Sequence, residues 1–456
     1  MRRIAAASVL VFFLLLQAQS ARKKDFSSPA GGMDPSAVGE HFLSNGLRIL
    51  TWEDHSAPII TYEVWFNVGS RNERPGITGI SHLFEHMMFK GSRKYGPEEH
   101  ANIVQSHGGR LNAFTANDMT VYYENISSDE LELVIALEAE RQANLAITAE
   151  NLASEREVVK EERRMRTDNN TFGDVMEQLM ANAFIAHPYQ WPVVGWMSDL
   201  NAITLEDCRE YHRIHYAPNN ATIVLVGDFN TNMALQLIEK YYGAIPKQEP
   251  PPPVSTVEPQ QRGERRIKLH RLAQLPMLFA GYHIPNIIHE DMPAIAVAQK
   301  ILSDGESSRI YKKLIYEDQI AMYAGGSVDE ARDPSLFYAY CGMNIGHGIE
   351  EGERALFEII EGLAQNPPTS EELQKAKNQL EADYILSLQS NSRKAYNLGF
   401  YQTVAGDWRL MFKISEKYAA VTAEQVAEVA ARYFTERNRT TVVLIPEQQT
   451  GMTLNR

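Results

Sequence analysis

Hydrophobic and polar positions alternate along four stretches in the first third of the chain, and this two-residue period predicts β-strands. Residues 42–52 predict a hairpin with Asn45-Gly46 at its turn, because this pair favours the left-handed backbone of a tight turn. The same alternation recurs at 59–68, 112–116 and 120–126. Residues 128–143 and 148–166 instead have the periodicity of helices, and each opens with a capping residue. This mixture of strands and helices predicts an α+β fold.

The two halves of the chain resemble one another. Residues 204–226 match residues 422–444 at a constant offset of 218 positions, and each segment predicts a capped helix, a turn and a hydrophobic strand. In the same way, the strand at 59–68 and the helix after it correspond to residues 277–284 and 292–302. An internal duplication of one domain explains both correspondences.

The first residues have the features of a secretory signal peptide. Arg2-Arg3 precedes an apolar run of 13 residues from Ile4 to Leu16, and small residues follow up to Ala21. Such a run is short for a membrane span, so cleavage is the expectation and an uncleaved N-terminal anchor is the alternative. The signal predicts export across the inner membrane to the periplasm, with a eukaryotic secretory route as the alternative.

Composition narrows the class of protein. The chain has 456 residues, 44% of them hydrophobic, which is enough for two globular domains. Its formal net charge of −14 argues against a nucleic-acid partner. Cys208 and Cys341 match no metal or redox spacing and predict buried thiols.

Glu249-Pro-Pro-Pro-Pro253 predicts a stiff, extended linker between the two halves. The predicted organisation is a signal peptide at 1–21, a flexible leader at 22–40, an N-terminal domain at 41–248, a Pro-rich linker at 249–264 and a homologous C-terminal domain at 265–456.

One cluster of residues carries the candidate chemistry. In His82-Leu-Phe-Glu85-His86 the two imidazoles are four residues apart, so on a helix they lie on one face, with Glu85 on the same arc. Two neutral nitrogen ligands and a neighbouring carboxylate suit a Zn²⁺ ion, a water molecule and a general base. The order of the residues is that of the inverzincin motif. The N-terminal domain is therefore the predicted zinc-binding domain, whereas the second repeat has no such motif.

A third protein ligand is expected, because catalytic zinc sites usually have three. Glu155 and Glu162 are seven residues apart and share one helical stripe with Val158 and Val159, whereas Glu161 and Arg163 are predicted to point away. We interpret Glu162 as the ligand and Glu155 as a residue that orients the site. A solvent-facing charged surface is the alternative that spacing alone leaves open.

These motifs resemble those of the pitrilysin-type zinc metallopeptidases. The resemblance rests on His82, Glu85 and His86, on the Glu-Arg-x-Val-Val-x-x-Glu run that ends at Glu162, and on Gly109-Arg-Leu-Asn112-Ala-Phe-Thr, and it covers about residues 41–446. In length the chain is similar to the bacterial relatives of the mitochondrial processing peptidase β subunit. The resemblance implies one zinc ion per chain held by His82, His86 and Glu162, with Glu155 accessory to it.

The family likeness also implies a fold and an activity. It implies two homologous α+β domains, each a mainly antiparallel sheet with helices packed on it, which together form half of a clamshell. It implies a zinc metalloendopeptidase that hydrolyses short or unfolded peptides in a closed chamber, with Glu85 as the general base. Asn112 and Ala113 would bind an extended substrate as an added strand.

The second repeat departs from the family pattern at one position. The family has an Arg and, seven residues later, a Tyr that reach the substrate; here Tyr323 fits the second position, but Tyr316 stands at the first. We therefore expect a heterodimer with a paralogous subunit that lacks the zinc motif and carries the Arg/Tyr pair. A homodimer is the competing expectation.

Two other functions are weighed against proteolysis. A non-catalytic scaffold or a subunit of a processing complex would not need His82, Glu85, His86 and Glu162 together. A zinc-storage protein would not need Glu85, so a Glu85→Gln variant separates storage from hydrolysis.

Overall fold

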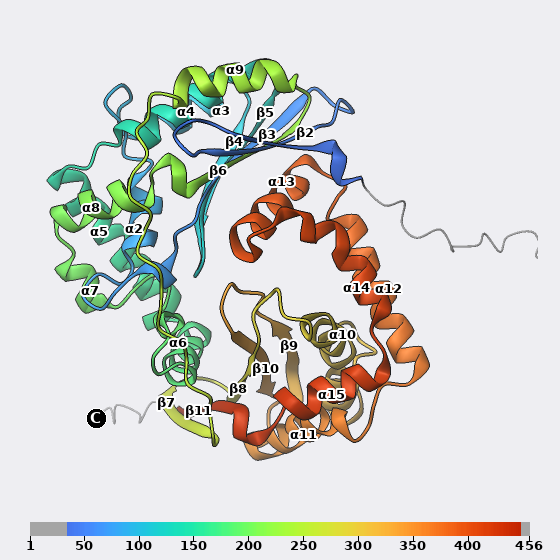
Figure 1. Cartoon of the computed structure of the whole chain (residues 1–456). Helices are drawn as coiled ribbons and strands as arrows, with labels where there is room; N and C mark the ends of the chain where they lie inside the picture. Colours follow the sequence, from blue (N-terminus) through green and yellow to red (C-terminus); the bar gives the residue numbers. More distant parts are fainter. Residues whose placement is uncertain (1–33, 448–456) are drawn as a thin grey trace, which may run out of the picture. The chain divides into compact units, whose positions relative to one another are not determined.

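The computed structural model describes residues 34–447, so the predicted signal peptide at 1–21 lies outside the described residues. Strands and helices alternate through this part of the chain (Figure 1). The strands are β1 Val38–Phe42, β2 Arg48–Glu53, β3 Ile59–Phe66, β4 Arg110–Thr115, β5 Thr120–Ser127, β6 Ala221–Gly227, β7 Arg265–Leu272, β8 Met277–Ile284, β9 Ala321–Val328, β10 Ser335–Met343 and β11 Arg439–Glu447. The helices are α2 Ile80–Met87, α3 Glu99–Ser106, α4 Leu131–Asn144, α5 Ala149–Arg163, α6 Thr171–Ala183, α7 Met197–Ala202, α8 Leu205–His215, α9 Thr231–Tyr242, α10 Met292–Ser303, α11 Ile349–Glu361, α12 Ser370–Leu386, α13 Asn391–Phe400, α14 Ile414–Ala420 and α15 Ala423–Tyr433.

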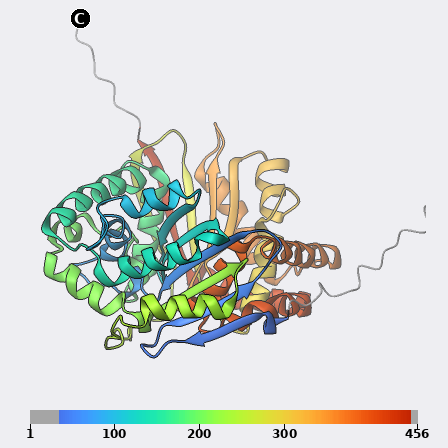
Figure 2. The same ribbon diagram turned by 90° about the horizontal axis from the view of Figure 1, so that it is seen from above.

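Two mainly antiparallel sheets organise the described residues. The first has the strand order β1-β2-β6-β3-β5-β4 and the second has the order β7-β11-β8-β10-β9. Each sheet contains one parallel pair, β2 with β6 and β11 with β7. Figure 2 shows α9 lying across the strands of the first sheet, against which its apolar face is buried. The predicted fold class, an α+β fold with helices packed on antiparallel sheets, is confirmed.

The strand orders also match repeat against repeat. Removing β1 from the first sheet leaves the order β2-β6-β3-β5-β4, which corresponds strand by strand to the second sheet. The helices α8 and α15 begin and end at positions that differ by the offset of 218, and both are capped by a threonine whose hydroxyl accepts a main-chain N–H. The structure therefore supports the internal duplication inferred from the sequence.

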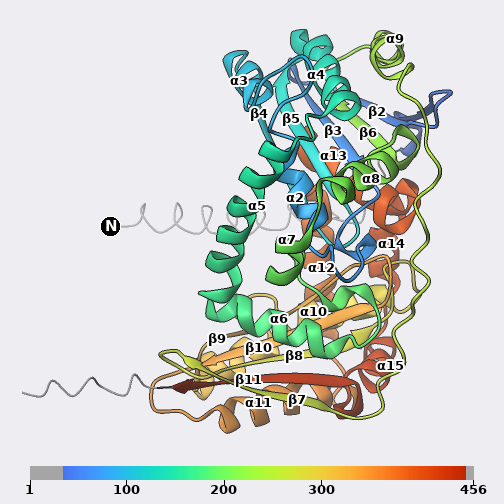
Figure 3. The same cartoon turned by 90° about the vertical axis from the view of Figure 1, so that its left-hand side faces the viewer.

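The two repeats exchange a helix. Helix α6 comes from the first repeat but packs on the second sheet, where Val175 and Leu179 share a core with Phe279, Val442 and Leu444. Helix α13 comes from the second repeat but packs on the first sheet, with Tyr396 against Trp65 at 5.5 Å between ring centroids. Figures 1 and 3 show both helices on the sheet opposite to their own repeat.

Local features of the fold bear on the sequence-based expectations. Strand β1 begins at Val38, inside the leader predicted at 22–40, because Val38–Phe42 pairs with β2 in the expected hairpin. Gly46 adopts the left-handed backbone, φ +88°, at the turn of that hairpin. The linker is anchored, since the Glu258 carboxylate accepts main-chain N–H groups from residues 185–187. The division of the chain into domains at 41–248 and 265–456, with a linker at 249–264, stays a prediction.

Among residues 34–447, no helix combines the length and the apolar character that crossing a bilayer requires.

Candidate metal centre

Helix α2 carries the His82 motif and is held rigidly at its N-terminus. Its cap residue, Gly79, has φ +88°, and a Cβ there would lie 2.4 Å from the Val194 carbonyl oxygen, so only glycine fits. Gly79 has no side chain with which to cap the helix; instead the buried Glu73 carboxylate accepts the N–H groups of Gly79 and Ser81, both at 2.8 Å. Burial raises the pKa of Glu73 to about 8, while the hydrogen bonds from Ser81 and Gly79 act to lower it.

Three predicted ligands converge where α2 packs on α5. His82 Nε2 lies 3.6 Å from Glu162 Oε1, and His86 Nε2 lies 3.1 Å from Glu162 Oε2. One ligand atom from each of the three residues lies within 4.8 Å of the others. The side chains are 8%, 21% and 16% exposed for His82, His86 and Glu162, so the cluster is largely shielded from solvent but still reachable.

This donor set fits a zinc ion. The two imidazole–carboxylate separations are near the roughly 3.3 Å between neighbouring ligands of a tetrahedral zinc ion. Burial lowers the pKa of His82, which favours the neutral imidazole that a metal requires. For His86 burial acts in the same direction, but hydrogen bonding to Glu155 and Glu162 raises its pKa to about 9. A positive charge, from a proton or a metal ion, is therefore favoured between His86 and Glu162.

Two further charged side chains complete the surroundings. Glu155 is buried, with one carboxylate oxygen 3.7 Å from His86 Nδ1 and the other 3.2 Å from Lys90 Nζ. Although its burial acts to raise the pKa of Glu155, His86 and Lys90 hold it below the usual value. Arg166, whose side chain is 74% exposed, pairs with Glu162 at 2.7 Å. Glu155 thus lies where a residue that orients His86 would lie.

Glu85 lies beside the ligands rather than among them. Its Oε2 accepts a hydrogen bond from Thr115 Oγ1 at 2.8 Å, which ties the α2 carboxylate to the end of β4. Burial raises the pKa of Glu85, while the hydrogen bond from Thr115 acts to lower it. Thr115 has no role in the sequence-based prediction, because only the fold brings it to Glu85. In the sequence, only its position in the family-like run that contains Asn112 could have indicated that Thr115 lies near the site.

The predicted substrate residues fall into two groups. Asn112 and Ala113 lie on β4, the last strand of the first sheet, so within residues 34–447 one side of β4 pairs with no strand, and Asn112 is exposed. Tyr323 lies on β9, the last strand of the second sheet, where its hydroxyl contacts Met277 Sδ at 3.9 Å and its ring faces Tyr340. These Tyr323 contacts are all within the second sheet, and Tyr316 is 73% exposed. The structure thus joins Asn112 and Ala113 to the Glu85 side of the site but leaves Tyr323 apart from it.

Two details of the predicted stripe on α5 are wrong. Arg163, expected to point away, is buried, because it pairs with Glu177 of α6 at 2.7 Å and donates to the Gly195 carbonyl. Val158, expected to face inward, is 46% exposed. The inward stripe therefore runs through Glu155, Val159 and Glu162.

A second group of side chains that could bind a metal lies in the core next to β5. His100, Glu124 and Glu138 bring one ligand atom each within 4.8 Å, and all three are buried. The Arg141 guanidinium pairs with Glu138 and lies 4.5 Å from the centre of the Tyr122 ring. Because Arg141 already supplies the cation, we interpret this group as a buried ion pair rather than a metal site.

Comparison with known proteins agrees with this geometry. Residues 48–195 match the family described as insulinase, peptidase family M16, and residues 202–380 match the family described as the peptidase M16 inactive domain. A relative from Helicobacter pylori, named zinc protease PqqE, is 31% identical over 408 residues, which are 89% of this chain and 92% of the relative.

Solved structures show the same fold. The crystal structure of a protease from Helicobacter pylori superposes with a TM-score of 0.87 at 30% identity, covering 90% of this chain and 99% of that one. The periplasmic protease PqqL from Escherichia coli superposes with a TM-score of 0.75 at 17% identity, but 91% of this chain covers only 48% of that one. From the sequence identity and the matched domains together, the chain belongs to peptidase family M16.

Proposed function

We propose that this chain is a zinc-dependent endopeptidase that cuts short or unfolded peptides. The observation that carries the proposal is the convergence of His82, His86 and Glu162 on one point, with Glu85 held next to it by Thr115. The names of relatives as zinc proteases support it. The match of residues 202–380 to an inactive domain does not include His82, Glu85, His86 or Glu162, so it does not weaken the proposal.

His82, His86 and Glu162 would hold one zinc ion, and Glu155 would orient His86. When bound, the ion supplies a Lewis acid that polarises the peptide carbonyl and lowers the pKa of a water molecule. Glu85 takes a proton from the attacking water, whose oxygen bonds to the carbonyl carbon. Glu85 then delivers that proton to the amine nitrogen as the carbon–nitrogen bond breaks. Thr115 holds the carboxylate in position for both transfers.

The free edge of β4 would bind the substrate. An extended peptide that pairs with residues 112–115 forms main-chain hydrogen bonds that do not depend on its sequence. Asn112 is exposed on this strand, and its amide is available to the peptide backbone. Since Thr115 ends the strand and contacts Glu85, a peptide on this edge passes next to the general base.

A mixture of short unfolded peptides tests the proposal. The purified mature chain should cut them, as read by mass spectrometry; a chelator should stop the cutting and added zinc should restore it. The Glu85→Gln variant should retain one zinc per chain and lose the cutting. Absence of bound zinc in the wild-type protein would contradict the proposal.

A second chain completes the enzyme in our proposal, because Tyr316 stands where the family has an arginine and because Tyr323 contacts Met277 and Tyr340 of its own sheet. The PqqL chain, of which this chain covers 48%, is long enough to hold two such halves. The partner would be a paralogous subunit with the Arg/Tyr pair, or a second copy of this chain. Full activity of the isolated monomer, shown by light scattering and peptide cleavage at the same concentration, would remove the need for either.

We also propose that the protein acts in the periplasm, on the evidence of the apolar run after Arg2-Arg3. Fractionation of the native host with an antibody tests this: the protein should appear in the periplasmic fraction and begin after residue 21. Recovery in the cytoplasm with residue 1 intact would contradict it.

A further inference from the structure

Side chains alternate between the two faces of β4, the strand whose free edge would bind the peptide. Thr115 faces α2, where its hydroxyl donates to Glu85, and the other odd-numbered residues of β4 pack into the core on the same face. The side chains of Arg110 and Asn112 therefore project from the opposite face of the strand.

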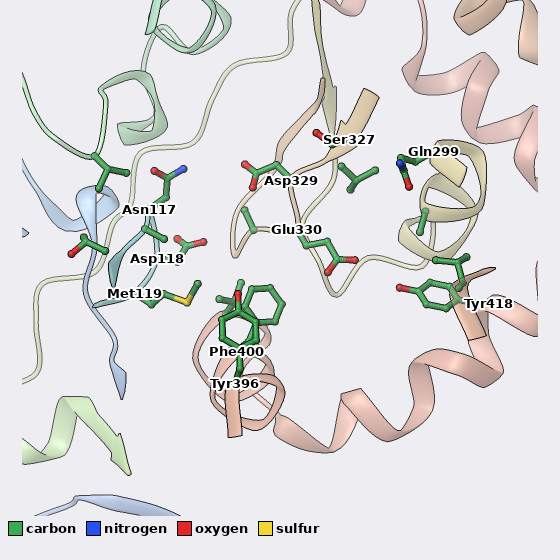
Figure 4. Close-up of a pocket in the computed structure, with 18 residues that line it drawn as sticks. Asn117, Asp118, Met119, Gln299, Ser327, Asp329, Glu330, Tyr396, Phe400 and Tyr418 are labelled. Atoms are coloured by element: carbon green, nitrogen blue, oxygen red, sulfur yellow. The ribbon is translucent and has the colours of Figure 1, made fainter. Parts of the chain in front are cut away.

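Helix α13 borders this opposite face. Phe114, the next even-numbered residue of β4, lies 6.1 Å from the Tyr396 ring of α13, measured between ring centroids. Figure 4 shows Tyr396 beside Phe400 of the same helix. A peptide strand on the free edge of β4 would turn every second side chain toward this face, because neighbouring strands share their alternation.

Arg110 has no partner on its own sheet. Its side chain is exposed, and within residues 34–447 it forms no hydrogen bond or ion pair. Its direct neighbour on β5 is the uncharged Asn125, whose side-chain oxygen already accepts hydrogen bonds from the hydroxyls of Thr61 and Ser392. The free edge of β4 is therefore the side from which a carboxylate can approach Arg110.

Most exposed arginines are simply hydrated, and Arg93 is an example in this chain. It is also exposed and without a side-chain hydrogen bond or ion pair in the described part of the chain, but it lies in the loop after α2. Arg110 differs in its position, two residues before Asn112 on the strand that ends beside Glu85. In a chain with a net charge of −14, a free cation on this strand changes which peptides are attracted to it.

The position of Arg110 along β4 determines where its partner lies in the peptide. Residues directly opposite each other in paired strands point to the same face, with their Cβ atoms about 4.5–5.5 Å apart. Arg110 precedes Thr115 by five residues, or about 17 Å at roughly 3.4 Å per residue. Because Thr115 contacts the general base, the residue opposite Arg110 lies about four to six positions from the cut bond.

We infer that Arg110 binds an acidic side chain of the peptide being cut. The inference rests on the proposed function and adds a substrate class to it, namely peptides with a glutamate or aspartate at that distance from the cut bond. A peptide that runs antiparallel to β4 carries this residue after the cut bond, and a parallel one carries it before the cut bond.

A peptide scan tests the inference. A single glutamate is moved along one cleavable peptide with both ends blocked, and each version is compared with its glutamine counterpart, which has nearly the same shape without the charge. Mass spectrometry locates the cut in each peptide. At one position, about four to six residues from the cut bond, glutamate should raise kcat/KM about two- to fivefold, the range of an exposed ion pair.

Three variants assign this preference to Arg110. In Arg110→Gln the ratio of kcat/KM between the glutamate and glutamine peptides should fall to about one. In Arg110→Glu the preference should reverse, so that a lysine at the same position is cut faster than a glutamate. Arg93→Gln removes a matched exposed arginine outside the strand and should keep the wild-type ratio.

A binding measurement separates this inference from the proposed function. Fluorescence anisotropy gives the Kd of each labelled peptide for the Glu85→Gln variant, with and without Arg110→Gln. Tighter binding of one glutamate peptide that disappears with Arg110→Gln, and that weakens as salt is added, supports the inference even if the wild-type chain cuts nothing. Equal binding of the glutamate and glutamine peptides at every position, or a glutamate preference that survives Arg110→Gln, would overturn it.

Discussion

Glu73 provides the sharpest test of how the fold holds the candidate site. Its carboxylate caps α2 from outside the helix, accepting two main-chain N–H groups at 2.8 Å while only 6% exposed. Replacement by alanine leaves both donors buried without a partner. Each such donor costs about 1–3 kcal/mol, so the variant should lose roughly 2–6 kcal/mol.

The size of the chain sets the expected shift in Tm. An unfolding entropy of about 2.1 cal/mol/K per residue makes 1 kcal/mol worth about 1 °C here, so Tm should fall by about 2–6 °C. Calorimetry of the purified chain measures this fall, and zinc titration should show weaker binding because His82 and His86 lie on the loosened helix. Glu73→Gln retains one acceptor and should lose less than alanine.

A matched control is Glu416→Ala, which removes an exposed carboxylate on α14 and should change stability by no more than about 0.5 kcal/mol. If Glu73→Ala unfolds within 1 °C of the wild type and binds zinc equally, the capping argument is refuted.

Three further outcomes are expected. Thr115→Val removes the hydrogen bond to Glu85 and should lower kcat about three- to tenfold while the zinc content stays unchanged. A pre-steady-state assay at saturating peptide measures this effect, and an unaltered kcat would refute the role of Thr115 in positioning Glu85. Gly399→Ala places a Cβ 2.0 Å from the Trp65 ring and should cost about 1–3 kcal/mol in urea unfolding, unlike alanine at the open Gly263 position. Burial acts to raise the pKa of Asp333, but His187 and Arg71 lower it to about 2 in the folded state, so this group stabilises the fold above pH 4 and loses that effect as the pH falls through 2. In Asp333→Asn the free energy of unfolding, measured by urea titration, should therefore fall less steeply with pH in this range. A variant whose stability falls with pH as steeply as that of the wild type would refute the argument.

Much of the fold was predictable because local pattern and repetition act together. The Asn45-Gly46 hairpin, the alternating strand at 59–66 and the threonine cap of α5 each follow from short-range chemistry. The constant offset between 204–226 and 422–444 indicated the duplication, and the matching strand orders agree with it.

The exchange of α6 and α13 could not be predicted in this way. Both helices have an apolar face, and nothing in such a face says which of two homologous sheets it will cover. The domain boundary at 248 follows the linker along the sequence, whereas the core around Val175 and Leu179 belongs with the second sheet. Which sheet each of these helices covers is decided by packing between residues far apart in the sequence, and local sequence patterns do not record such packing.

The candidate site likewise contains some residues that the sequence predicted and others that only the fold brings together. His82, Glu85 and His86 share one helix, so their spacing points to a metal. For Glu162 the spacing from Glu155 left a solvent-facing surface open, and the family resemblance decided its assignment as a ligand. Thr115 is 30 residues away from Glu85 in the sequence, and Glu73 lies outside the helix whose N-terminus it caps, so only the folded chain brings either of them to the site. Arg163 was misplaced because its partner Glu177 lies on α6, whose position the sequence leaves open.

The measurement that tests the central claim most directly is the cleavage rate of one quenched fluorescent peptide by the wild-type chain and by Glu85→Gln. Both proteins are first shown by elemental analysis to hold one zinc per chain, together with any partner found necessary. The account predicts that the variant loses about 10²- to 10⁴-fold in kcat, the contribution of a general base. Equal rates from the two zinc-loaded proteins would contradict the role of Glu85, and with it the proposed mechanism.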